Sequence, residues 1–328
     1  MRIAVMGTGG TGGYFGGLLA RAGEEVTFIA RGAHLEAIRN NGLTIKSVLA
    51  GDFTICATAT DNPGNIGPVD FVLFCVKAYD NAVAADQIRP LMGPESIVLS
   101  VQNGIDNEKQ IGDVVGHEHI IGAVSYVSST IDSPGVIAQT AGPGKIVLGE
   151  MKGGTSQRTA MLKGALQKAG ITAELHPNIQ VALWQKFMAI CGVNGVTALT
   201  RLSMGEILAC AETAKLLRRT MEEVEAVACA SAAALPEACV DQSMDFFSSF
   251  EPMMRGSMYY DLAAGRRLEL DVLNGTVVRL GNEHGIPTPM NFAIYAALKP
   301  YLDGTPASSA LLPGSTPTTR APFLSLIP

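Results

Sequence analysis

The chain has 328 residues, of which 47% are hydrophobic and 16% are charged, and its formal net charge is −6. A chain of this length is expected to form two domains, and its apolar content favours large buried cores over disorder. A negative charge without a cluster of Lys and Arg argues against nucleic acid and anionic membranes as partners.

No run of 18 or more apolar residues predicts a membrane span. A strand begins with the first residues, MRIAVMG, which leaves no room for a signal peptide, so we expect a cytoplasmic protein. The six cysteines form no CxxC and no metal-ligand spacing with histidine. We therefore expect buried thiols in a reducing compartment and no metal site.

Short β-rich runs alternate with helical stretches in the first half of the chain. We expect strands at 2–6, 25–30, 70–76 and 96–101, and helices at 10–21, 34–40 and 81–91. The last two of these strands are apolar throughout, which is typical of parallel strands covered on both faces. Further elements are expected as a hairpin or strand pair within 42–60, more strands within 118–150, a helix near 155–169 and a last strand near 171–176. The alternation predicts a doubly wound α/β fold of the Rossmann type.

The second half of the chain has a different texture. Stretches rich in Ala, Leu and Met predict helices at 178–199, 203–234, 236–249, 257–264, 269–284 and 289–302. We therefore expect a Rossmann domain over 1–177, an all-helical domain over 178–302, and a tail rich in Pro, Ser and Thr over 303–328. The tail ends in FLSLIP, an apolar sequence suited to a homodimer contact, although the sequence leaves the oligomeric state open.

A glycine-rich motif, GTGGTG, directly follows the first strand and opens a helix. In this context Gly7 permits the tight turn, Gly9 lets the backbone approach a pyrophosphate, and Gly12 lets helix and strand pack closely. The helix N-terminus then faces the phosphates. An ordinary glycine-rich turn is the alternative. The predicted cofactor contacts in this loop are Gly7, Thr8, Gly9, Gly10, Thr11 and Gly12.

Three polar residues follow other strands at the same edge of the predicted sheet. Arg31 stands after the second strand, where an enzyme that uses NAD usually has an acid for the ribose, so we expect NADPH. Stacking of Arg31 on adenine, without selection of the phosphate, is the alternative. Lys77 and Asn103 follow the next two apolar strands. Ligands of open α/β sheets bind at the carboxyl ends of strands, so these residues should share one crevice.

The combination of motifs now points to a known family. Its pieces are GTGGTG at 7–12, Arg31, Val76-Lys77, QNG at 102–104, Lys186 with Asn194, Ser257-Met258 with Asp261, Glu269 with Asp271 and Asn274-Gly275, and GIPTP at 285–289. Over roughly residues 1–302 the chain resembles the ketopantoate reductase (2-dehydropantoate 2-reductase) family, within the 6-phosphogluconate-dehydrogenase-like group. The resemblance implies a substrate cleft between a Rossmann domain and a helical domain. It also implies reduction of 2-dehydropantoate to pantoate with NADPH, on the route to pantothenate and coenzyme A.

Lys186 is the strongest catalytic candidate. It lies in a helix that is apolar nearly all the way round, and burial lowers the pKa of a lysine toward neutrality. Hydride transfer to a ketone builds an alkoxide, which needs a proton. We expect Lys186 to supply that proton, as the resemblance also implies; a lysine whose head reaches water is the alternative. Asn194 lies two turns further along the same stripe and would bind a substrate hydroxyl or carboxylate.

Two residues beyond this helix complete the expected site. By resemblance, Ser257 binds the substrate carboxylate; a simple helix cap is its alternative role. Glu269 is expected in both the catalytic and the cofactor-binding sets, with Asn103 in both the substrate and the cofactor sets. Glu269 is suited to holding Lys186 protonated, or it is merely an acid in the first turn of a helix. Asp261 is expected to be structural and to pair with Arg266 or Arg267.

Two positions depart from the pattern of the best-known ketopantoate reductases. Ile190 and Met254 are apolar where those enzymes present polar side chains to the substrate. Because discrimination for a hydroxyl depends on paired contacts, these changes bear on the substrate more than on the catalysis. A reductase of a different, less polar 2-oxo acid is therefore the second hypothesis, and a NADP(H)-binding sensor without turnover is the third.

Overall fold

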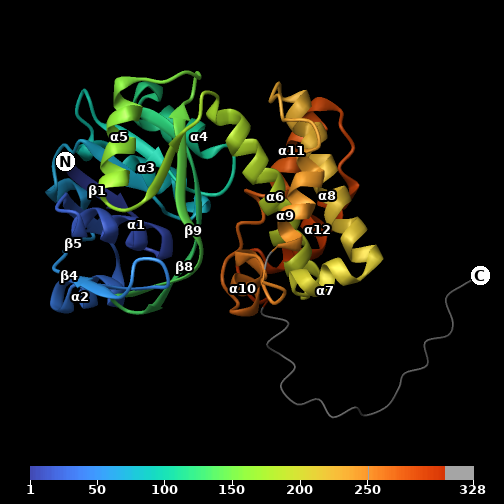
Figure 1. The fold of residues 1–328 in the computed structure, drawn as a ribbon, viewed down its shortest axis with the longest axis horizontal. Helices are drawn as coiled ribbons and strands as arrows, with labels where there is room; N and C mark the ends of the chain where they lie inside the picture. The colour runs from blue at the N-terminus through green and yellow to red at the C-terminus, as the bar shows by residue number, and fades with distance from the viewer. Residues whose placement is uncertain (250, 307–328) are drawn as a thin grey trace, which may run out of the picture.

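The computed structural model describes residues 1–249 and 251–306. An α/β part comes first and a helical part follows, with the two side by side (Figure 1). This is the expected fold class. The proposed domain boundary after residue 177 falls in the turn between the last strand and the first long helix. The tail from residue 307 onward, including FLSLIP, lies outside the described residues.

The strands of the α/β part are β1 (Arg2–Met6), β2 (Glu25–Ile29), β3 (Leu43–Ser47), β4 (Phe53–Ile55), β5 (Thr58–Thr60), β6 (Phe71–Phe74), β7 (Ile97–Ser100), β8 (Ile120–Ser133), β9 (Val136–Glu150) and β10 (Thr172–Leu175). Its helices are α1 (Gly10–Arg21), α2 (Gly32–Asn41), α3 (Asn81–Gln87), α4 (Asn107–Val115) and α5 (Gln157–Lys168). The expected strands and helices of this half are all present, with ends that differ by a few residues.

Six parallel strands form the cofactor-binding type of sheet. Their spatial order is β5-β2-β1-β6-β7-β8. Numbered along the chain among themselves, these strands run 3-2-1-4-5-6, which is the order of dinucleotide-binding sheets. The order reverses between β1 and β6, and a ligand crevice is expected outside the carboxyl ends of strands at that point.

The segment 42–60 was expected to be a hairpin or a strand pair, and this is only partly right. β3 and β4 do pair as an antiparallel hairpin. β5 instead crosses to the opposite edge and pairs in parallel with β2. It thereby covers what would be an open edge beside the cofactor crevice. The strands expected within 118–150 are the long antiparallel pair β8 and β9, which extends the sheet to β3 and β10.

The helical part consists of α6 (Ile179–Thr200), α7 (Met204–Ala209), α8 (Ala211–Ala230), α9 (Cys239–Ser248), α10 (Ser257–Ala263), α11 (Asn274–His284) and α12 (Pro289–Leu298). Two expectations need correction. The stretch 203–234 is two helices, because Cys210 has an extended backbone (φ −108°, ψ 122°). The helix expected from 269 begins only at Asn274, because residues before it form turns. Glu269 is therefore not a first-turn acid.

Helix α6 passes from one hydrophobic core to another. Its first turns, with Ile179 and Leu183, pack against Val124 and Val147 of the long strands. Its remaining length, from Trp184 onward, belongs to the core of the helical part. The helix thus connects the two parts without a break between them.

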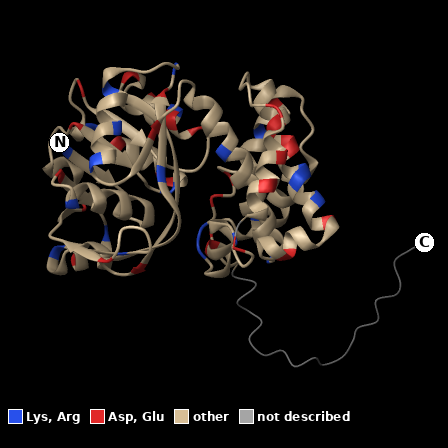
Figure 2. Ribbon diagram, in the orientation of Figure 1, with Lys and Arg blue, Asp and Glu red and all other residues tan. Residues whose placement is uncertain are grey.

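The surface and the thiols show two further features. Acidic and basic side chains are scattered over both parts (Figure 2). Among the described helices, none is both long enough and apolar enough to cross a bilayer. The expectation of buried thiols holds for Cys191 and Cys239 but is wrong for three others, which are exposed: Cys56, Cys210 and Cys229.

Candidate functional site

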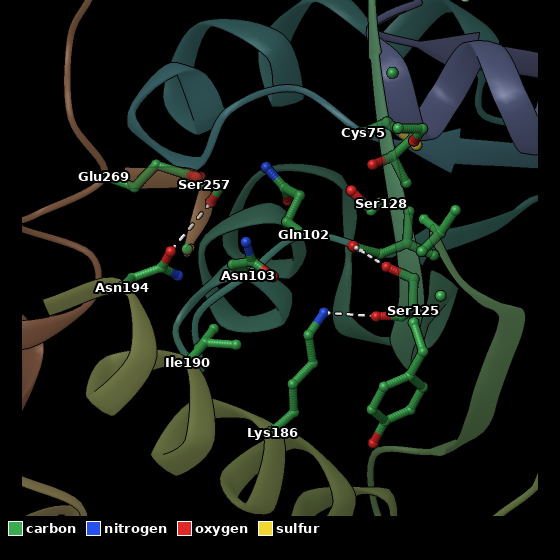
Figure 3. Close-up of a pocket in the computed structure, with 18 of the residues that line it drawn as sticks. Cys75, Gln102, Asn103, Ser125, Ser128, Lys186, Ile190, Asn194, Ser257 and Glu269 are labelled. Atoms are coloured by element: carbon green, nitrogen blue, oxygen red, sulfur yellow. Dashed lines mark hydrogen bonds between the residues drawn. The ribbon is translucent and has the colours of Figure 1, made fainter. Parts of the chain in front are cut away.

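A cavity of about 1100 Å³ opens at the carboxyl edge of the sheet and runs between β8, α6, α9 and the start of α10. Figure 3 shows side chains reaching into it from the sheet and from the helices. The predicted residues that line it are Gly7, Thr8, Gly9, Gly10, Thr11, Arg31, Lys77, Asn103, Lys186, Asn194, Ser257 and Glu269. Gly12 is the one predicted residue that does not line it. The fold thus brings together residues from almost the whole described chain.

The glycine loop is shaped by close backbone contacts. Gly7 has a φ of +95°, and a Cβ there would lie 2.8 Å from the backbone nitrogen of Val76. A Cβ on Gly12 would overlap the carbonyl oxygen of Gly7, so Gly12 serves the packing of α1 on β1. A Cβ on Gly10 would overlap the backbone of Ser129 on β8. Larger residues at these positions would push the strands and the helix apart.

The loop fits the diphosphate of a dinucleotide. Gly9 borders the cavity, and a Cβ built on it would meet nothing within 4 Å, so the backbone there is open to a ligand. Helix α1 starts at the next residue, with no side chain capping its first N–H groups. Unpaired N–H groups at a helix N-terminus bind phosphate oxygens. Thr8 is different, because its N–H and its hydroxyl both donate to the Ile29 carbonyl, at 3.0 and 2.9 Å.

Arg31 stands directly before α2, and its guanidinium is available to a ligand. The side chain is exposed, and its Nη2 donates to Gln87 Oε1 at 3.3 Å. No carboxylate of the described residues forms an ion pair with it. Sequence reasoning missed His34, which lines the cavity three residues later and accepts a hydrogen bond from Gly135 N at 3.0 Å. Burial lowers the pKa of His34, which favours the neutral form of this ring.

Lys77 is held by carboxylates of the helical part. Its Nζ donates to Glu269 Oε2 at 2.8 Å and to Asp261 Oδ2 at 3.1 Å. Burial by itself would lower the pKa of Lys77, but the charges of Glu269 and Asp261 outweigh it and raise that pKa. Asp261 also accepts from Arg266 Nε at 2.8 Å, so the expected pairing of Asp261 is confirmed. These ion pairs join the sheet to the region of α10.

Lys186 projects from α6 into the cavity (Figure 3). Its Nζ donates to the Ser125 carbonyl on β8 at 2.8 Å and lies 5.9 Å from the centre of the Tyr126 ring. Burial lowers the pKa of Lys186 to about 8, although the charges of Glu269 and Glu108 act in the opposite direction. Glu269 therefore acts on Lys186 through space, while its direct hydrogen bond goes to Lys77. A lysine in this setting can give up a proton near neutral pH.

Asn103 faces the cavity from the end of β7. Its backbone carbonyl accepts from Asn107 Nδ2 at 2.9 Å, and its side chain has no partner within the described residues. Gln102, which sequence reasoning passed over, donates through Nε2 to the Val76 carbonyl and to Asn81 Oδ1, at 2.7 Å each. It ties together the ends of β6 and β7, which carry Lys77 and Asn103. The QNG spacing gave the signal for it.

Asn194 and Ser257 meet where α10 packs on α6. Asn194 Oδ1 accepts from Met258 N at 3.1 Å and from Ser257 Oγ at 3.4 Å (Figure 3). Asn194 thus caps α10 from a neighbouring helix, in the way a capping side chain does locally. Its Nδ2 has no partner among the described residues and borders the cavity. The close contact requires Gly256, since a Cβ there would overlap Asn194.

The two apolar residues that depart from the family pattern, Ile190 and Met254, also line the cavity. Ile190 lies on α6 one turn after Lys186 and one turn before Asn194, and its side chain stands between theirs (Figure 3). Met254 lies just before α10. Both pack against the core of the helical part.

Comparison with known proteins gives a consistent result. The family model described as "Ketopantoate reductase PanE/ApbA" matches residues 3–153. The family model described as "Ketopantoate reductase PanE/ApbA C terminal" matches residues 178–302. The chain is 31% identical to the 2-dehydropantoate 2-reductase of Mesorhizobium japonicum, over 91% of this chain and 97% of that one. It is 34% identical to the PanE/ApbA family ketopantoate reductase of Ralstonia eutropha JMP134, with a TM-score of 0.85 over 92% of this chain and 98% of that one.

A more distant structure shares the fold. A D-mandelate dehydrogenase, solved with NADH and anilino(oxo)acetate, is 23% identical with a TM-score of 0.84, and the match covers 92% of this chain and 98% of that one. The two family models match both parts of the chain, and the Mesorhizobium relative is similar over nearly its whole length. The chain therefore belongs to the ketopantoate reductase family of oxidoreductases.

Proposed function

We propose that this protein reduces a 2-oxo acid to the corresponding 2-hydroxy acid with NADPH, and that Lys186 is the proton donor. The observation that carries the proposal is the position of Lys186 Nζ. It is desolvated enough to have a pKa near 8, and it borders the cavity that the glycine loop also lines. A reduced nicotinamide supplies hydride in such a reaction.

The residues around Lys186 have distinct tasks in this proposal. Lys186 donates a proton to the oxygen of the substrate carbonyl as negative charge develops there. The free amide groups of Asn103 and Asn194, with the hydroxyl of Ser257, receive the carboxylate. The Ser125 carbonyl orients Lys186 Nζ through the bond at 2.8 Å. Glu269 favours the protonated form of Lys186 through its charge.

NADPH is proposed over NADH because of Arg31. The exposed guanidinium stands at the end of β2 without a carboxylate partner in the described chain, where it suits a 2′-phosphate. The open backbone at Gly9 and the first turn of α1 would hold the diphosphate.

Two substrates fit this proposal. 2-Dehydropantoate is the first candidate, because relatives at about 30% identity are named for it; with it would come a role in making pantothenate. A less polar 2-oxo acid is the second candidate, favoured by Ile190 and Met254 in the cavity. We extend the proposal to a homodimer, by analogy with the dimeric ketopantoate reductase of Staphylococcus aureus.

Replacement of the lysine tests the proposal. We expect Lys186→Ala to fold and bind NADPH but to lose roughly 10²- to 10⁴-fold in kcat, because general acid catalysis contributes that much. The measurement follows NADPH absorbance with a panel of 2-oxo acids and NADPH binding by fluorescence titration. Lys215→Ala, which removes an exposed lysine of α8, should keep full turnover.

Two outcomes would contradict this. Near-normal turnover by Lys186→Ala would show that another group donates the proton. Tight NADPH binding by the native protein, with no consumption of NADPH on any 2-oxo acid, would favour a sensor without turnover.

A further inference from the structure

One side of the cavity is built from apolar side chains of the helical part. We call this side the apolar wall; it consists of Met188, Ile190, Val193, Phe246, Phe247 and Met254. Five of its members belong to the helical core or pack against it: Met188, Val193 and Phe247 as buried core residues, and Ile190 and Met254 as partly buried neighbours. Apart from Phe246, which is exposed, the wall is therefore a surface of a packed core, and this part is fixed in shape.

The position of the wall relates it to the substrate. Ile190 stands between Lys186 and Asn194 on one stripe of α6, so it adjoins both the proposed proton donor and a proposed carboxylate ligand (Figure 3). The ketone and the carboxylate of a 2-oxo acid are taken by the polar side of the cavity. Whatever substituent the substrate carries beyond these two groups must then lie against the wall.

Polar groups close to the wall are already engaged. Ser243 Oγ donates to the Cys239 carbonyl at 2.8 Å, and Cys239 Sγ donates to Glu225 Oε1 at 3.1 Å. Arg255 donates to the carbonyls of Met253 and Arg201, at 3.2 and 3.4 Å, and its Nη2 pairs with Glu206 Oε2 at 3.6 Å. Gln242 and Glu251 also line the cavity, but both are exposed, where water competes for their hydrogen bonds.

We propose that the preferred substrate is a 2-oxo acid whose side chain is bulky and wholly apolar. This rests on the proposed function, and it favours the second of the two candidate substrates over 2-dehydropantoate. A hydroxyl on that side chain would lie against the wall without a buried hydrogen-bond partner, which is unfavourable. An apolar pocket rejects an added hydroxyl by up to about 10²-fold, whereas a site built to bind the hydroxyl rejects its apolar analogue by roughly 10⁴-fold or more. The sign of the preference therefore distinguishes the two kinds of site.

A matched pair of substrates provides the test. 2-Dehydropantoate and 3,3-dimethyl-2-oxopentanoate differ only in that a methyl group replaces the hydroxyl. For the native protein with NADPH, we expect kcat/KM to be about 10- to 100-fold higher for the methyl compound. In straight-chain 2-oxo acids, kcat/KM should rise roughly fourfold for each added methylene that reaches the wall.

The outcomes separate this inference from the proposed function. An equal or higher kcat/KM for 2-dehydropantoate would overturn the apolar preference and leave the reductase function standing. Failure to reduce either compound, or any other 2-oxo acid of the panel, would overturn the proposed function itself.

A polar substitution in the wall locates the preference. The ratio to follow is kcat/KM for the methyl compound divided by kcat/KM for 2-dehydropantoate. Ile190→Asn should lower this ratio about tenfold, because the new amide can pair with the hydroxyl of 2-dehydropantoate. Leu199→Asn is the matched control: Leu199 lies on the same helix and is partly buried against the same core, but it does not line the cavity. Its ratio should not change. Both substrates are measured on one preparation, so partial unfolding cancels from the ratio. An unchanged ratio in Ile190→Asn would remove Ile190 from substrate selection.

Discussion

At the scale of single residues, two lysines of one cavity have opposite environments. Lys77 is paired with two carboxylates, and its pKa is raised. Within the described part of the chain Lys186 donates only to a carbonyl, and its pKa is lowered to about 8. Glu269 touches the first and acts on the second through its charge. Lys77 therefore keeps its charge throughout the physiological range, whereas Lys186 can exchange its proton there.

The pH dependence of reduction follows from this difference. Because only protonated Lys186 can donate, we expect kcat to be constant at lower pH and to fall tenfold per pH unit above about pH 8. Glu269→Gln should move this descending limb of the pH profile to lower pH, since the charge of Glu269 raises the pKa of Lys186. Asp261→Asn removes the other carboxylate on Lys77 and should leave the limb in place. A limb that moved equally in both variants would contradict the role of Glu269.

Sequence patterns located the polar residues of the site but not their partners. Lys77 and Asn103 could be placed because parallel strands bring their carboxyl ends to one edge. The partners of Lys77 lie 184 and 192 residues further along the chain, and the partner of Lys186 is a backbone carbonyl 61 residues away. Such contacts depend on how the helical part docks, which no local pattern encodes.

At the scale of elements, most strands and helices followed from hydrophobic pattern and turn residues. The exceptions are set by tertiary contacts. β5 has three residues, too few for a pattern, and it is a strand because it pairs with β2. The division of the stretch 203–234 depends on the extended backbone of Cys210. The late start of α11 depends on turns around Glu269, which direct its side chain toward Lys77.

The contact of α6 with α10 gives a prediction at this scale. Asn194→Ala removes the acceptor for Met258 N, and Thr197→Val removes the acceptor for Gly256 N, at 3.1 Å in each case. We expect each variant to lower the free energy of unfolding by about 1 kcal/mol, measured by chemical denaturation. Only Asn194→Ala should also raise KM for the 2-oxo acid, because Thr197 does not line the cavity. An equal rise in KM for Thr197→Val would make the role of Asn194 purely structural.

At the scale of the whole molecule, ion pairs connect the α/β part to the helical part. Glu269 and Asp261 have side chains that are 7% and 11% exposed, and Lys77 is 40% exposed. In a second pair, Arg279 with Asp106, the carboxylate is considerably more exposed, at 34%, while the cation is about as exposed as Lys77. The pairs of Lys77 should therefore contribute more than the pair of Arg279 to the stability of the folded protein.

Removal of each cation tests this ranking. Lys77→Met should lower the free energy of unfolding by roughly 1–2 kcal/mol, a value between those of exposed and buried pairs because Lys77 is only partly exposed. Arg279→Met should cost less than about 1 kcal/mol. Urea denaturation of both variants measures the two losses. A loss in Lys77→Met no larger than that in Arg279→Met would show that burial of the carboxylates adds nothing.

Helix α6 runs unbroken from one core to the other, and this separates the position of the proton donor from the choice of substrate. Its first turns pack on β8 and β9, and Lys186 donates a hydrogen bond to the Ser125 carbonyl of the same sheet. The source of the proton is thus fixed relative to the edge that holds the glycine loop, whatever occupies the far side of the cavity. Side chains on α9 and before α10 can be exchanged without moving that source. Descendants of this chain could therefore acquire new substrates by altering one face of a cavity, while the reaction itself is inherited unchanged.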